Sequence, residues 1–122
     1  MATLTAQATL TGSGLTSMDQ AFTKNPVITI SGAVTIQRKK LSTTASTLLV
    51  ASAWTGSMVW IFNTEAAGGN AIKIVASEGG VTYFTILPGE WAFFPWESTA
   101  DMLADASSGT PTVEVGIFQR DA

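Results

Sequence analysis

The residues able to do chemistry are few, and their types restrict what the chain can do. The sequence contains neither histidine nor cysteine. Catalysis of the Ser-His-Asp or Cys-His type is therefore excluded, and a disulfide framework is absent as well. A Ser-Lys arrangement is formally open, but no recognised motif contains any of the lysines at Lys24, Lys39, Lys40 and Lys73.

Carboxylates are the remaining candidates for acid–base work. Two of them at a suitable separation can cleave a glycosidic bond, and the candidates are Glu90, Glu97, Asp101 and Asp105. Glu90 has a simpler interpretation, because a polar residue is expected at the end of a Pro-Gly turn. Asp101 and Asp105 lack the spacing of a known calcium loop. We therefore expect no enzyme, no cofactor and no metal site.

Charge is sparse in this sequence. Charged residues make up 12% of the chain, against about 25% in a typical domain. The net charge is −3, which argues against nucleic-acid binding. The only basic cluster is Arg38–Lys40; we interpret it as a solvated loop, with contact to a phosphate or an acidic partner as the alternative.

Hydropathy predicts a non-membrane protein with an apolar surface. Mean hydropathy is +0.31, yet no run approaches the roughly 18 apolar residues of a membrane span. The N-terminus has neither the basic nor the apolar region of a signal peptide. A charge-poor, apolar chain of 122 residues suggests that part of its surface is buried against other subunits.

The elements that position these residues are predicted best at 71–97. Apolar residues alternate with polar ones, Glu78–Gly80 interrupts them, and Pro88-Gly89 forms a second turn. This segment predicts three strands, at Ile72–Ala76, Val81–Leu87 and Trp91–Phe94, with Pro95 ending the third.

Short strands are predicted along the rest of the chain. They lie at 2–11, 27–30, 33–37, 47–50, 57–63, 102–106 and 112–118, with a Ser31-Gly32 turn between the second and third. Helical alternatives remain at 41–52 and 102–106, and one helical turn capped by Ser17 is possible within 15–25. About eight strands at roughly ten-residue spacing predict an all-β fold, a single antiparallel β-sandwich or a barrel.

The N-terminus has a pattern of its own. Residues 2–11 alternate strictly, with Leu4 and Leu10 on the apolar side, and the Gly12–Gly14 segment follows as a hinge. We expect an extended N-terminal arm at 1–25 and a sandwich domain at 26–122. The arm could pair with a neighbouring subunit, or it could be an edge strand of its own sheet.

Four tryptophans complete the candidate residues. Trp60 and Trp91 lie on predicted strands and are assigned to the core. Trp54 and Trp96 lie at strand ends, where they could contribute to a subunit interface or stack on a sugar. The candidate interface residues are thus Leu4, Leu10, Trp54 and Trp96.

Residues 41–118 carry a combination of motifs. The strand MVWIFN ends in Asn63, a turn follows at Leu87-Pro88-Gly89-Glu90, and the chain closes with a hairpin at Ala106–Val115. This resembles the small β-sandwich virion proteins of tailed bacteriophages, over about two thirds of the chain.

The resemblance implies a jelly-roll-like sandwich carried on a phage particle. It implies a capsid decoration or cement protein, made in the host cytoplasm and bound to the head surface. Its partners would be further copies in a homotrimer and the major capsid protein, with no nucleic acid and no membrane. The alternative is a tail-fibre or adaptor module that binds a host-surface glycan or receptor.

Overall fold

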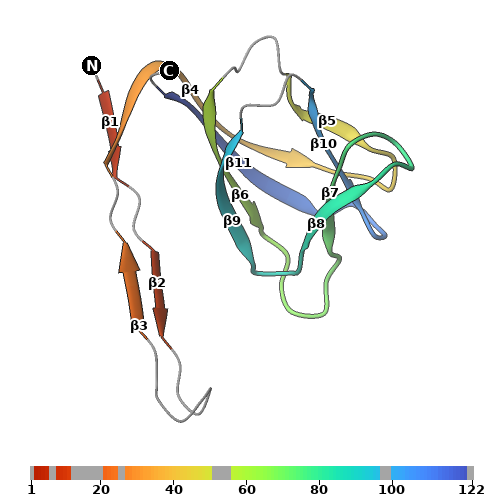
Figure 1. Ribbon diagram of the computed structural model, residues 1–122. Coiled ribbons are helices and arrows are strands. Elements are labelled where there is room, and N and C mark those ends of the chain that lie inside the picture. Colours follow the sequence, from red (N-terminus) through yellow and green to blue (C-terminus); the bar gives the residue numbers. More distant parts are fainter. Residues whose placement is uncertain are drawn as a thin grey trace.

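The computed structural model describes residues 2–5, 8–11, 21–24, 27–50, 56–96 and 100–120 (Figure 1). These residues form strands and turns, with no helix among them. The strands are β1 (Ala2–Thr5), β2 (Ala8–Thr11), β3 (Ala21–Lys24), β4 (Val27–Lys40), β5 (Ser46–Leu49), β6 (Ser57–Asn63), β7 (Ile72–Val75), β8 (Thr82–Ile86), β9 (Trp91–Trp96), β10 (Met102–Ala106) and β11 (Thr112–Arg120). The all-β prediction is confirmed, and the helical alternative at 102–106 is wrong.

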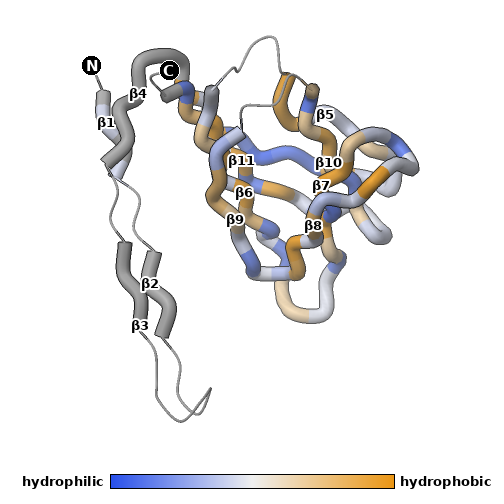
Figure 2. The backbone as a smooth tube through the Cα atoms, in the orientation of Figure 1, coloured by the Kyte–Doolittle hydropathy of each residue, from blue (hydrophilic) through white to orange (hydrophobic). Residues whose placement is uncertain are grey.

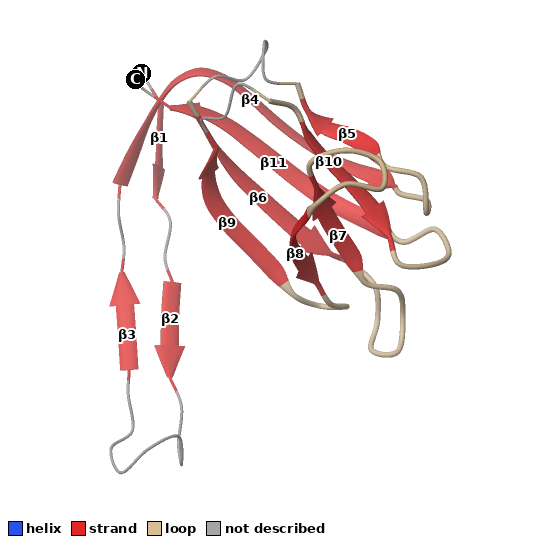
Figure 3. Cartoon of the chain, turned by 45° about the vertical axis from the view of Figure 1, so that its right-hand side comes forward, coloured by secondary structure: helices blue, strands red, loops and turns tan. Residues whose placement is uncertain are grey.

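Eight strands, β4 to β11, form an antiparallel β-sandwich (Figure 3). The first sheet has the order β1-β4-β11-β6-β9, to which the sandwich contributes the last four strands, and the second has the order β5-β10-β7-β8. The pairs are nested along the chain: β4 with β11, β5 with β10, β6 with β9, and β7 with β8. This nesting is the wrapping of a jelly roll, so the expected sandwich has jelly-roll topology.

The core lies between the two sheets and follows the two-residue period of a strand. On β6, Val59 and Ile61 are fully buried, and on β11 the residues Val113, Val115 and Ile117 point to the same side. The second sheet and the segment before it supply the other core residues: Leu41, Leu48, Leu49, Ile72, Ile74, Ile86, Met102 and Ala104. The sandwich strands carry most of the hydrophobic colour in Figure 2.

The N-terminal strands extend from the sandwich at the start of β4 (Figures 1 and 3). β1 pairs with Val27–Ile30 of β4 and is an edge strand of the first sheet. β2 and β3 pair with each other in a separate two-stranded sheet. The predicted single strand at 2–11 is therefore two strands, which pair with different partners. The predicted helical turn at Ser17 and the hinge at Gly12–Gly14 lie outside the described residues.

Two predicted strand boundaries are wrong. Ser31-Gly32 is not a turn, because β4 continues through it. The register moves from Val34 opposite Phe118 to Ile30 opposite Arg120, so β4 has extra residues here, as in a β-bulge. Arg38–Lys40 consequently lies on a strand and not in a loop.

The second boundary is at Pro95, which does not end β9. It pairs with Met58, and the strand runs on to Trp96. β9 is the edge of its sheet, and an edge strand tolerates proline when the missing N–H would face outward.

Candidate interaction surface

The three motifs behind the phage resemblance meet around Asn63, at the end of β6. Its side chain is fully buried. Nδ2 donates to the carbonyl oxygens of Ile86 and Asn70, each at 3.0 Å, and Oδ1 accepts from the N–H of Glu65 at 3.1 Å. Ile86 belongs to β8 of the second sheet, so this amide joins the two layers and satisfies backbone groups that would otherwise be buried without partners.

The Leu87–Glu90 turn packs against the backbone of Asn63. Glu90 N–H donates to the carbonyl of Leu87 at 3.0 Å, and Gly89 has a φ of 81°, which is a type II turn. Gly89 N–H donates to the carbonyl of Asn63, whose own N–H donates to the carbonyl of Glu90. Glu90 Oε1 accepts from Leu87 N–H at 2.8 Å. The carboxylate of Glu90 therefore stabilises the turn.

The closing hairpin completes this junction. The hydroxyl of Ser108 donates to Oδ1 of Asn70 at 2.6 Å, and the hydroxyl of Thr64 donates to the carbonyl of Thr112 at 2.7 Å. Asn63 itself lies opposite Val113 in the sheet. The residue types in all three motifs thus have a structural explanation in the hydrogen bonds that close one end of the sandwich.

Within the part of the chain that the structure describes, the other proposed acids are not grouped together. Asp105 is buried on β10, and Lys73 Nζ lies 3.6 Å from its Oδ1, an oxygen that accepts no hydrogen bond. Asp101 is exposed, and Glu97 lies outside the described residues. Among the described residues, no three acidic side chains are grouped closely enough to hold a metal ion.

The structure gives the predicted interface residues different environments. Trp96 is half-buried against the core, makes edge contacts with Tyr83 and Phe94, and donates from Nε1 to the carbonyl of Ala100 at 3.3 Å. Leu4 lies on β1 opposite Ile28. Leu10 lies on β2 opposite Phe22, and Trp54 is outside the described residues.

The assignment of Trp60 and Trp91 to the core is wrong. Trp60 is half-buried and Trp91 is 52% exposed, and their rings stack at 5.1 Å. Their neighbours Val59, Ile61 and Ala92 face the core, so strand alternation directs the two indoles to the outer side of the first sheet.

The outer side of the first sheet is largely apolar between Val34 and Arg38 of β4 and the strands that pair with them, and we call this part the apolar face. The strand register arranges it in three rows that cross β4, β11, β6 and β9. They are Arg38-Glu114-Phe62-Trp91, Ile36-Gly116-Trp60-Phe93 and Val34-Phe118-Met58-Pro95. Ile36 is 67% exposed and Val34 49% exposed. Exposed apolar patches with aromatic residues mark protein interaction sites.

Local contacts hold the middle of this face together. A Cβ at Gly116 would lie 3.1 Å from the ring of Phe118 and 3.5 Å from Cβ of Trp60, so glycine allows these side chains to lie across β11. Trp60 Nε1–H donates to Oε1 of Glu114 at 3.4 Å, and Arg38 Nη2 lies 3.4 Å from Oε2 of the same carboxylate. The carboxylate of Glu114 thereby pairs with polar atoms of two neighbouring strands.

The outer side of the second sheet differs from the apolar face. Its central row pairs Asp105 with Lys73 and Lys73 with Thr85. Lys73 and Asp105 form the ion pair described above. This row is polar, whereas the next row on the same side pairs Leu103 with Val75, which is buried.

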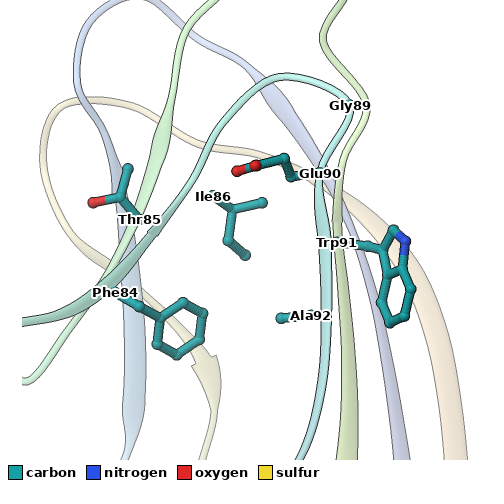
Figure 4. A pocket seen from close by; sticks show the side chains of 7 residues that line it. All are labelled: Phe84, Thr85, Ile86, Gly89, Glu90, Trp91 and Ala92. Carbon is teal, nitrogen blue, oxygen red and sulfur yellow. The ribbon is translucent and has the colours of Figure 1, made fainter. Parts of the chain in front are cut away.

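An open pocket of about 430 Å³ lies between the edge strands β8 and β9. Figure 4 shows Phe84, Ile86, Glu90 and Ala92 directed into it and Trp91 directed away from it. Phe84 packs edge-on against Phe94 at 5.5 Å. The exposed indole and the pocket therefore lie on opposite sides of β9 and do not form one sugar site.

The sequence contains a signal for the apolar face. In the strand SMVWIFN, the core residues Val59 and Ile61 alternate with Met58, Trp60 and Phe62. Such a continuous apolar run is typical of a strand that is buried on both sides. In a two-layer sandwich, however, only the inner side of each sheet is covered by the other sheet. The apolar residues of this strand therefore lie on both of its sides, one in the core and one on the apolar face.

Comparison of this chain with protein-family models, with curated proteins and with solved structures found no match. Within the described residues, no helix has the length and hydropathy needed to span a membrane.

Proposed function

We propose that this chain is a structural protein of a tailed-phage particle and acts as a capsid decoration or cement protein. In this proposal it has no catalytic activity. It is made in the host cytoplasm, assembles as a homotrimer and binds the head surface, where it bridges neighbouring major capsid subunits. The jelly-roll topology is compatible with this role, and so is the scarcity of charge.

The observation that carries the proposal is the apolar face. A protein that only had to fold would gain nothing from exposing Ile36 and Trp91 to water. Covering apolar surface contributes about 25 cal/mol per Å², so subunits that bury this face would stabilise the assembly that contains them. The energy of particle stabilisation would come from this burial.

The N-terminal arm has a supporting role in the proposal. Residues 1–25 would act as the arm and 26–122 as the sandwich, with Leu4 and Leu10 contributing to contacts between subunits. β1 is an edge strand whose outer side has no strand partner among the described residues. A further strand could add there through backbone hydrogen bonds.

The copy number of the protein per virion tests this proposal. Quantitative mass spectrometry of purified particles should find it in numbers comparable to the major capsid protein. A few copies per particle would contradict a decoration role and indicate a tail component.

Deletion of residues 1–14 tests the arm. The truncated protein should keep the sandwich, because β1 pairs only with Val27–Ile30, but should no longer bind to heads that lack the native protein. Normal binding by the folded, truncated chain would exclude the arm from the mechanism.

The exposed indole of Trp91 favours one alternative, a tail-fibre or adaptor module that binds a host-surface glycan or receptor. An exposed aromatic ring can stack on a sugar. In that case a glycan array should give hits that Trp91→Ala abolishes, and the copy number should be low. An array without hits, together with a high copy number, would reject this alternative.

A further inference from the structure

The apolar face has two exposed borders, and each lies on a free sheet edge. Val34, Ile36 and Arg38 form the β4 border. Within the part of the chain that the structure describes, β4 pairs over these residues with β11 alone, since β1 reaches only Val27–Ile30. Pro95, Phe93 and Trp91 form the β9 border, on a strand that pairs with β6 alone among the described residues. The middle of the face is more buried. Gly116 and Met58 are buried there, whereas the residues of the two borders are exposed or half-buried.

Row by row, the two borders are chemically complementary. Arg38 shares a row with Trp91, Ile36 shares one with Phe93, and Val34 shares one with Pro95. The side chain of Arg38 is 70% exposed, and a guanidinium binds favourably over an indole ring. If two copies met at these borders, the other two rows would place Ile36 against the ring of Phe93 and Val34 against the ring of Pro95.

Both edges also discourage direct strand pairing. The β4 edge carries Arg38, Lys39 and Lys40, and the β9 edge carries Pro95. Charged residues and proline on an edge strand oppose the addition of another strand. Contact at these edges therefore has to come from the side chains on the apolar face.

From this arrangement we infer that the apolar face lines the rotation axis of a closed ring of this chain, with the β4 border of each copy packed on the β9 border of the next. The axis runs along the strands, which keeps the rows matched. The occupant of the face is thus a further copy of the same chain. This inference rests on the self-assembly in the proposed function and assigns the surface that makes it.

The mass of the protein in solution is the first test. The wild type should sediment at three times the 12.7 kDa chain mass. Ile36→Glu, which places a charge on the β4 border, should reduce the mass to that of one chain. Thr85→Glu is the matched control, since it changes an exposed residue on the edge strand β8 of the other sheet and should leave the mass unchanged. A monomeric wild type, or an oligomer insensitive to Ile36→Glu, would overturn the inference.

Disulfide trapping tests which borders meet. The native chain has no cysteine, so introduced pairs are unambiguous. Ile36 and Phe93 lie three strands apart in one row, about 14 Å at roughly 4.8 Å per strand, too far for a bridge within one chain. The double variant Ile36→Cys/Phe93→Cys should give oxidised, disulfide-linked trimers. The pair Thr47→Cys/Thr85→Cys on the other sheet should remain monomeric on a non-reducing gel.

Single-cysteine variants separate this ring from a two-fold dimer. In the ring, Ile36 meets Phe93 and not another Ile36, so neither single variant should cross-link. Disulfide-linked dimers of Ile36→Cys alone or Phe93→Cys alone would show that the face packs on itself about a two-fold axis, and would overturn the inferred arrangement.

The ring and the proposed function can fail separately. A monomeric protein present in capsid-like copy number would overturn the ring and leave the decoration role in place. A trapped trimer present in only a few copies per particle would keep the ring and reject the decoration role.

Discussion

The outer sides of the two sheets differ in their central rows, although both sheets cover the same core. The second sheet presents Lys73, Asp105 and Thr85 in one row, and the first presents Ile36, Trp60 and Phe93. Each outer side also contains one cross-strand ion pair, which is Lys73 with Asp105 on one side and Arg38 with Glu114 on the other.

This difference distinguishes the residues that form the core from the exposed residues of the apolar face, which the core does not require. The inner sides of both sheets supply the core cluster, and the outer side of the second sheet places the polar residues Lys73 and Thr85 where the first sheet places aromatic ones. Folding therefore does not explain the apolar face. Aromatic residues and arginine, which interface cores concentrate, are the residue types found on this face.

The largest expected effect contrasts neighbouring residues of β6. Ile61→Ala should lower the free energy of unfolding by about 2–5 kcal/mol, because it leaves a cavity at a fully buried site. Trp60→Ala, on the outer side, should cost the isolated subunit about 2 kcal/mol, from the half-buried surface and the ring stacking that it loses, while abolishing self-association. Urea denaturation in dilute solution measures both. Equal losses would place the apolar face in the folding core.

Removing the cation of either ion pair should have an intermediate effect on the free energy of unfolding. Lys73→Ala leaves the carboxylate of Asp105 buried without its cation and should cost about 1–2 kcal/mol, below the full value of a buried pair because Lys73 is partly exposed. Arg38→Ala should cost less than about 0.5 kcal/mol, since its side chain is largely solvated. Asp105→Asn in the Lys73→Ala background should restore part of the loss. Similar costs for Lys73→Ala and Arg38→Ala in thermal denaturation would contradict this difference.

The smallest effect on stability is expected from Gly116→Ala. The new Cβ would meet the Phe118 ring, which must turn aside, but alanine also removes the entropy cost of a strand glycine, about 0.5–1 kcal/mol. The free energy of unfolding should therefore change by less than about 0.5 kcal/mol. Displacing the ring should weaken self-association roughly fivefold, about 1 kcal/mol. Sedimentation at several concentrations would detect this, and unchanged association would show that Phe118 does not contribute.

Much of the fold could be predicted from local patterns. The strand Ser57–Asn63 and the Pro88-Gly89 turn have the predicted positions, because strand alternation and a glycine with positive φ are determined by neighbouring residues. The errors at Ser31-Gly32 and Pro95 have one cause. Each of these segments is compatible with a strand because of its sheet context, a β-bulge at Ser31-Gly32 and an edge position at Pro95.

The candidate surface was harder to predict than the strands. Alternation along a strand separates two sides but does not say which one meets the core, and an aromatic residue suits either a core or an interface. Trp60 and Trp91 were therefore assigned to the wrong side of their strands. The surplus of apolar residues was visible in the composition, but its location was not.

The sequence by itself determined the all-β class, the turn chemistry and the scarcity of charge, since these depend on residue types and on contacts a few positions apart. Only the tertiary structure decided the nested order of the strands, because that order pairs residues as distant as Lys40 and Thr112. The same pairing brings β4, β11, β6 and β9 into one sheet, and so it alone gathers dispersed apolar residues into a single exposed face.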